Sequence, residues 1–122
     1  MPWTAHFFET TNGQAPAREF LDALEPAHRM RLAARVEAVQ QSGFSLGGGI
    51  FEVCHDYADL YEIRAKVSRH LLRLYCTLDG TRLILISGLH KHENEATPKS
   101  VLEEAAAYIA EFRQTGRVVR LD

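Results

Sequence analysis

Apolar residues in the first third of the chain recur at the spacing of helices. Aromatic and β-favouring residues at 3–9 predict a first strand, and the turn-forming residues 10–14 end it. Pro16 and Pro26 suit the first turns of two helices, because a first turn leaves its amide hydrogens unbonded. The second helix has an apolar seam at i, i+4 and i+7, formed by Leu32, Val36 and Val39. Residues 15–42 therefore predict a helical hairpin with one apolar seam.

The middle of the chain has the short apolar runs that are typical of strands. Residues 60–64, 71–75 and 83–92 form the three clearest runs. Asp79-Gly80 between the last two is a strong signal for a hairpin turn. Residues 51–54 fit either a short strand or an extended loop.

A last helix follows a polar, irregular segment. Thr97 is expected to cap it, with Pro98 as its first residue and Gly116 at its end. Its amphipathic stripe consists of Leu102, Ala105, Ala106, Ile109 and Phe112. The order β-α-α-β-β-β-α predicts an α+β fold in a single domain, residues 1–122. We expect the helical hairpin and the C-terminal helix to cover one face of a mostly antiparallel sheet.

Composition and charge exclude only a few classes of protein. The two cysteines, Cys54 and Cys76, are too few for a disulfide framework, and no apolar run approaches the roughly 20 residues of a membrane span. With no signal-peptide pattern at the start, we predict a cytoplasmic protein without membrane contact. The net charge is −2, but residues 61–99 contain seven Lys or Arg against four Asp or Glu, a local balance of +3. A local cationic region favours phosphate binding more than the total charge does.

Two arginines in neighbouring predicted strands could bind a phosphate. Arg64 and Arg73 would project from strands whose other residues are mostly apolar, and guanidinium groups offer forked donors that match phosphate oxygens. The alternative is that Arg64 or Arg73 forms an ion pair with Glu62, which stabilises little if it is exposed. For Arg73 we favour phosphate binding.

The segment His90-Lys91-His92 offers titratable groups at the end of the most apolar strand. In an extended chain the two imidazoles share one face and Lys91 takes the other. The histidines suit proton transfer, and lysine can stabilise negative charge. Solvated strand-end residues are the simpler alternative. A zinc site from His90, His92 and either Cys54 or Glu93 lacks a recognisable four-ligand spacing, so we predict no metal and no cofactor. The remaining histidines, His6, His28, His55 and His70, have no spacing that implicates them.

Over nearly its full length the chain resembles the HigB-like toxins, a branch of the RelE/ParE toxin superfamily with phage-derived members. The matching pieces are short, and their common order and spacing carry the resemblance. They are residues 18–24, residues 61–64, residues 72–75, residues 88–92, Thr97-Pro98 and Glu104-Ala105. The resemblance implies a RelE-like fold and the toxin role of a type II toxin–antitoxin system.

Related toxins are ribosome-dependent mRNA endonucleases in which the ribose 2′-hydroxyl attacks the adjacent phosphate without a metal. The resemblance implies that Arg64 and Arg73 hold and neutralise the phosphate, and that Lys91 and His92, with His90 beside them, transfer protons or stabilise charge. We expect further RNA contacts from the basic residues Lys66, Arg69 and Arg82. The implied partners are the ribosome with its mRNA and a cognate antitoxin of the helix-turn-helix class. The toxin would be either a homodimer or part of a toxin–antitoxin heterotetramer.

The chain departs from the family pattern in its charge. The family commonly has two lysines where this chain has Lys91-His92, and more lysine just before Thr97-Pro98. Here residues 93–96 are acidic, which weakens electrostatic affinity for RNA. Two alternatives therefore stay open: a non-catalytic, ParE-like inhibitor that binds DNA gyrase, and an attenuated binding module with the toxin fold.

Overall fold

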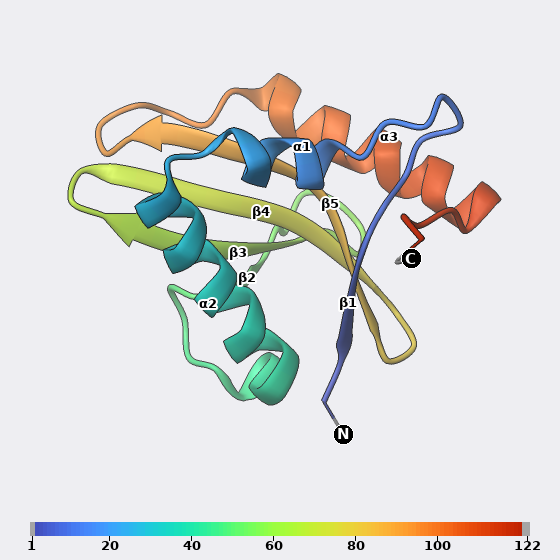
Figure 1. The fold of residues 1–122 in the computed structure, drawn as a ribbon, viewed down its shortest axis with the longest axis horizontal. Helices are drawn as coiled ribbons and strands as arrows, with labels where there is room; N and C mark the ends of the chain where they lie inside the picture. Colours follow the sequence, from blue (N-terminus) through green and yellow to red (C-terminus); the bar gives the residue numbers. More distant parts are fainter. Residues whose placement is uncertain (1, 121–122) are drawn as a thin grey trace.

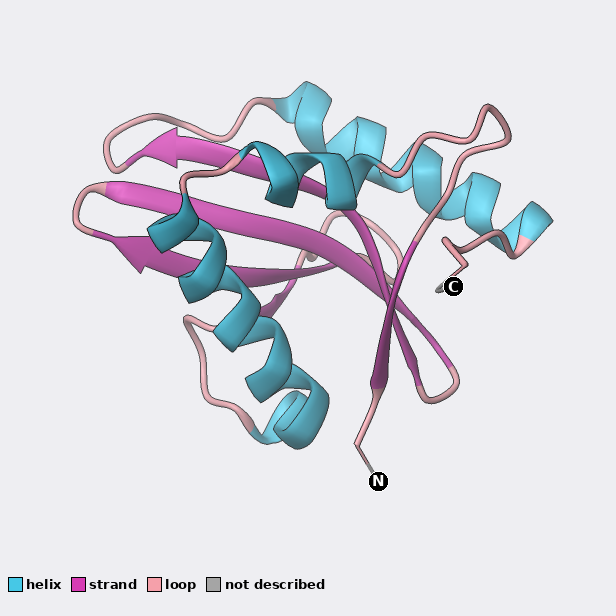
Figure 2. Ribbon diagram, viewed as in Figure 1, coloured by secondary structure: helices cyan, strands magenta, loops and turns pink. Residues whose placement is uncertain are grey.

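The computed structural model describes residues 2–120 and contains a five-stranded sheet with the order β1-β5-β4-β3-β2 (Figures 1 and 2). The elements are β1 (Thr4–Phe7), α1 (Pro16–Ala23), α2 (Pro26–Ser42), a 3-10 turn (Gly43–Ser45), β2 (Phe51–Val53), β3 (Tyr61–Val67), β4 (His70–Asp79), β5 (Arg82–His92) and α3 (Lys99–Thr115). β1 is parallel to β5, and the other neighbours are antiparallel. The predicted α+β fold with a mostly antiparallel sheet is confirmed, and residues 51–53 are a strand.

The prolines and the glycine that were expected at helix ends lie at or next to those ends. Pro16 and Pro26 open α1 and α2, and Gly116 follows α3 in the left-handed region with φ of 64°. That conformation lets the Gly116 amide donate to the Phe112 carbonyl at 2.7 Å. α3 starts at Lys99, one residue later than predicted, so Pro98 lies just outside the helix. No helix within residues 2–120 is long and apolar enough to cross a membrane.

The prediction that all helices cover one face of the sheet was wrong, because the sheet has a core on each side. One core joins α1 and α2 to strand residues that include Leu72, Leu74 and Leu85. The other joins α3 to Tyr75 and to alternate residues of β5 such as Ile84. We call the first side the hairpin face and the second side the α3 face. In Figures 1 and 2, α1 and α2 lie in front of the strands.

A β-bulge in β5 changes the face of the sheet on which the side chains after Ile86 lie. Cys76 pairs with Leu85, but the next residue, Tyr75, pairs with Ser87, so Ile86 is the extra residue. The alternation of side chains therefore shifts by one after Ile86. Leu89 accordingly packs against the α3 core. A Cβ on Gly88 would lie 2.1 Å from the Phe20 ring of α1, which places Gly88 on the hairpin face.

Candidate active site on the α3 face

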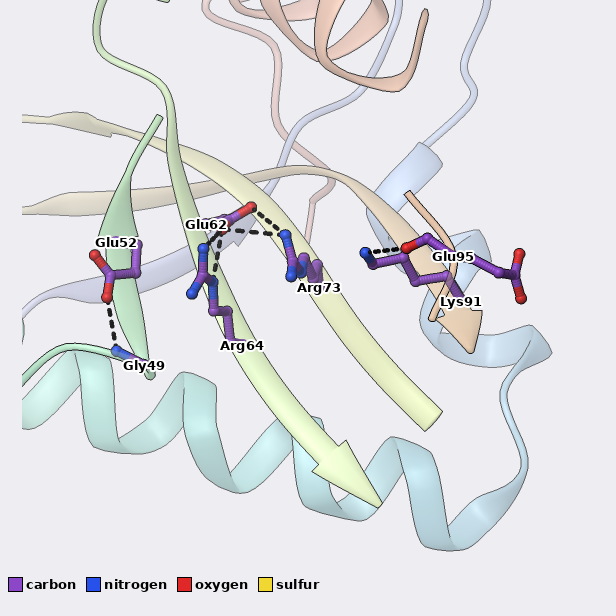
Figure 3. Close-up of polar contacts among 7 residues, drawn as sticks. All are labelled: Gly49, Glu52, Glu62, Arg64, Arg73, Lys91 and Glu95. Atoms are coloured by element: carbon purple, nitrogen blue, oxygen red, sulfur yellow. Dashed lines mark hydrogen bonds and ion pairs between the residues drawn. The ribbon is translucent and has the colours of Figure 1, made fainter. Parts of the chain in front are cut away.

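Glu62 holds two arginines on the α3 face of β3 and β4. Arg64 and Arg73 are directly opposite each other across the two strands. Arg64 Nε donates to Glu62 Oε1 at 2.6 Å, and Arg73 Nη1 lies 3.4 Å from both carboxylate oxygens (Figure 3). The alternative in which the arginines pair with Glu62 is thus present in the structure, with one difference. Glu62 is only 5 % exposed, so this is no surface ion pair.

The group carries a net positive charge beside an open pocket. Two guanidinium groups share one carboxylate, which leaves a formal charge of +1 and several free N–H donors. Arg64 has 38 % of its side chain exposed and Arg73 has 18 %, so both can reach a ligand. The pocket has a volume of about 210 Å³. Its lining residues are Val53, Cys54, His55, Asp56, Tyr57, Glu62, Arg64, Arg73, Thr97 and Leu102.

Burial raises the pKa of two other groups near the arginines. It raises the pKa of Cys54 to about 11, with the Glu62 charge adding and the Arg64 and Arg73 charges opposing. It also raises the pKa of Tyr75 to about 12, again with Glu62 adding and Arg73 opposing. The Tyr75 hydroxyl is buried without a hydrogen-bond partner among the described residues. The raised pKa disfavours the thiolate form of Cys54 in this pocket.

Two lysines extend the cationic side chains along the same face. Lys66 and Lys91 both lie opposite Leu71, in the row next to Arg64 and Arg73. Lys91 Nζ donates to the Glu95 carbonyl at 2.7 Å, and Lys66 forms a 2.8 Å ion pair with Glu93. We call Arg64, Arg73, Lys66 and Lys91 the cationic strip. The acidic segment after β5 thus neutralises part of its charge.

The other predicted site residues lie elsewhere. His90 and His92 follow the bulge onto the hairpin face, opposite Leu72 and His70, so the sheet separates them from the arginines. Arg82 is at the far end of the β4–β5 hairpin, where it pairs with Asp79 and lies over the Phe112 ring. Arg69 is exposed in the turn between β3 and β4. The roles of these four residues stay predictions, but the structure does not group them with the arginines, apart from Arg69 near the lysine end of the strip.

Sequence reasoning missed part of the pocket. Glu62 was considered only as a competitor for the arginines, whereas here it orients both of them. His55 and Asp56 reach the pocket from the loop after β2. Their spacing from Arg64 gave no signal, because only the antiparallel pairing of β2 with β3 brings that loop to the site.

Comparison with known proteins gives one match. The family model described as phage-derived protein Gp49-like (DUF891) matches residues 19–109, about three quarters of the chain and all of the residues that line the pocket. No curated protein matches the chain.

Proposed function

The chain belongs to the Gp49-like family of phage-derived proteins, a toxin-like family of the HigB/RelE type, and we propose that it is a HigB-like toxin that cleaves mRNA on translating ribosomes. The observation that carries the proposal is the Arg64–Glu62–Arg73 group beside an open pocket and two lysines. Such a surface suits a phosphodiester, whose negative charge grows during cleavage.

In the proposed reaction the ribose 2′-hydroxyl oxygen attacks the adjacent phosphorus. The bond from phosphorus to the 5′-oxygen breaks, which leaves a 2′,3′-cyclic phosphate and a 5′-hydroxyl. Arg64 and Arg73 donate hydrogen bonds to the non-bridging oxygens, where charge accumulates, and Glu62 keeps both guanidiniums in place. Among the pocket residues, Glu62, Asp56 and His55 are groups able to accept the 2′-hydroxyl proton.

Lys91 completes the proposed site from the end of β5. Its ammonium group can stabilise the leaving 5′-oxygen or protonate it. His90 and His92 are not assigned to this step, because they project from the opposite face of the sheet. A residue at position 91 can serve this face only because the bulge at Ile86 shifts the alternation of β5.

The charge balance supports a reaction that depends on the ribosome and on a partner. A net charge of −2 gives the free protein little general attraction for RNA, so the ribosome would have to present the mRNA. An antitoxin of the helix-turn-helix class could cover the cationic strip with an acidic segment. Its binding would then weaken as salt rises.

The test is induction of the chain in a bacterium without the neighbouring gene, with the 5′ ends of cellular mRNA mapped. We expect slow growth and new cuts confined to translated codons, carrying 5′-hydroxyl ends. In the same cells, a reporter transcript that lacks its ribosome-binding site and start codon should show no cuts. Growth arrest with intact transcripts would contradict the proposal.

A second candidate is a non-catalytic inhibitor that binds DNA gyrase. One observation favours it: Glu62 engages both arginines and Glu93 engages Lys66, as in a structural ion-pair network. The same cells discriminate the two, since gyrase inhibition leaves transcripts intact and changes plasmid supercoiling. An attenuated binding module would give neither effect.

A further inference from the structure

Four histidines gather on the hairpin face at the end of the sheet that carries the lysines on its other side. His28 lies in the first turn of α2, His70 opens β4, and His92 pairs with His70 from the end of β5. His90 completes the group, with its Nε2 atom 2.8 Å from His70 Nδ1. The centroid of the His28 ring lies 4.8 Å from the centroid of the His70 ring and 5.5 Å from that of the His90 ring.

His28 is the member whose position is hardest to explain without a ligand. It is 5 % exposed, and its Nδ1 atom is buried with no hydrogen-bond partner among the described residues. Its Nε2 atom lies 3.7 Å from a Glu25 carboxylate oxygen, too far for a hydrogen bond. Buried polar atoms are normally satisfied, because leaving one without a partner costs free energy.

We propose that His28, His70 and His90 bind a divalent transition metal ion, for which Zn²⁺ is the best fit. One ligand nitrogen from each ring lies within 4.8 Å of the other two. In a tetrahedral zinc site with bonds of about 2.0–2.1 Å, ligand nitrogens are about 3.3 Å apart. His70 Nδ1 and His90 Nε2 are 2.8 Å apart, and the upper limit for the three ligand atoms is 4.8 Å, so binding an ion would require the rings to adjust.

The three donor atoms are all imidazole nitrogens. Such a set suits Zn²⁺, Cu²⁺ and Ni²⁺ more than Mg²⁺ or Ca²⁺, which prefer oxygen ligands. Water, Glu25 or His92 could take the fourth position.

A metal here would tie the start of α2 to the ends of β4 and β5. It would act independently of RNA cleavage, because the sheet lies between it and the arginines. The site differs from the zinc alternative considered in the sequence. That alternative combined His90 and His92 with Cys54 or Glu93, whereas His28 and His70 are distant in sequence and meet them only in the fold.

The test is titration of the chelator-treated, untagged full chain with Zn²⁺ by calorimetry, with Co²⁺ absorption reporting tetrahedral geometry. Wild type and the control His6→Gln should bind one ion and gain thermal stability on binding. His70→Gln and His90→Gln should each weaken binding by more than about tenfold, because losing a ligand exceeds the loss expected from an outer partner. These two positions are chosen because His28 is buried and its replacement could impair folding.

His92→Gln separates the proposed site from a simple chelate on one strand. It should weaken binding less than His90→Gln does. Absence of Zn²⁺ binding by folded wild type would overturn the proposal. So would a site that needs His90 and His92 but is unaffected by His70→Gln.

Discussion

The polar residues on the two faces of the sheet form two different kinds of site. On the α3 face, Glu62 orients two arginines that line an open pocket. On the hairpin face, the His70 ring lies against the rings of His28, His90 and His92, and a Glu25 carboxylate oxygen is 3.7 Å from His28 Nε2. The first arrangement suits an anion and the second suits a metal ion.

This contrast arises within three consecutive residues. His90, Lys91 and His92 are adjacent in sequence, yet the pleat of β5 sends Lys91 to the arginines and the histidines to α2. Neighbouring residues of a strand can therefore belong to different sites on opposite faces of the sheet.

The largest effect is expected from removing one arginine of the α3 face. Arg73→Ala should reduce mRNA cleavage about ten- to a hundredfold, since a charge-assisted hydrogen bond contributes about 1.5–3 kcal/mol. The rate of appearance of cut transcripts after induction measures this. Arg31→Ala, on the exposed surface of α2, is the matched control. Normal cleavage by a folded Arg73→Ala protein would show that the Arg73–Glu62 pair is structural only.

The hairpin face can be perturbed by adding a single methyl group. Gly88→Ala would place a Cβ 2.1 Å from the Phe20 ring and push α1 away from β5. We expect a loss of about 1–3 kcal/mol in the free energy of unfolding. Denaturant unfolding measures it, with Gly47→Ala as the control because no atom lies within 4 Å of a Cβ there. Equal stability of the two variants would contradict the close packing of α1 on this face.

The charge of the α3 pocket can be followed through the reactivity of Cys54. Glu62 raises the pKa of this thiol, so Glu62→Gln should lower it from about 11 and increase the thiolate fraction at pH 8.5. A fall of half a pKa unit gives about a threefold faster alkylation by iodoacetamide. Arg64→Gln should slow the reaction, because Arg64 lowers the same pKa. Cys54→Ser identifies the labelled residue, since Cys76 is fully buried. An alkylation rate unchanged by either variant would mean that the charges of Glu62 and Arg64 do not affect the pKa of Cys54.

The smallest effect concerns the lysine end of the cationic strip. Lys66→Gln should reduce the salt dependence of binding to a single-stranded RNA by about 0.7 in the slope of log K against log salt. Lys99→Gln, at the exposed start of α3, should leave the slope unchanged. Equal slopes for wild type and Lys66→Gln would remove Lys66 from the RNA contacts.

Local signals in the sequence were sufficient for the helices and for part of the site. Pro16, Pro26 and the seam of α2 gave the helical hairpin, and strand alternation correctly separated Lys91 from the two histidines. Which face each would occupy could not be predicted. Unbroken alternation from Ile84 would have placed His90 and His92 with the arginines, and the single extra residue at Ile86 reverses this.

Contacts between segments that are distant in the chain could not be predicted from the sequence either. His28 and His90 are 62 positions apart and meet only because α2 crosses the ends of β4 and β5. Glu62 looked like an ordinary ion-pair partner, since nothing local in the sequence indicates that it is buried between two arginines.

The most direct test compares the two faces of the sheet in the same cleavage assay. The double variant His90→Gln/His92→Gln and the double variant Arg64→Gln/Arg73→Gln would each be induced without the neighbouring gene, and mRNA 5′ ends would be mapped. We predict the wild-type pattern of cuts for the histidine variant and a nearly complete loss for the arginine variant. Loss of cleavage in a correctly folded histidine variant, with cuts persisting in the arginine variant, would place the chemistry on the hairpin face and contradict an active site on the α3 face.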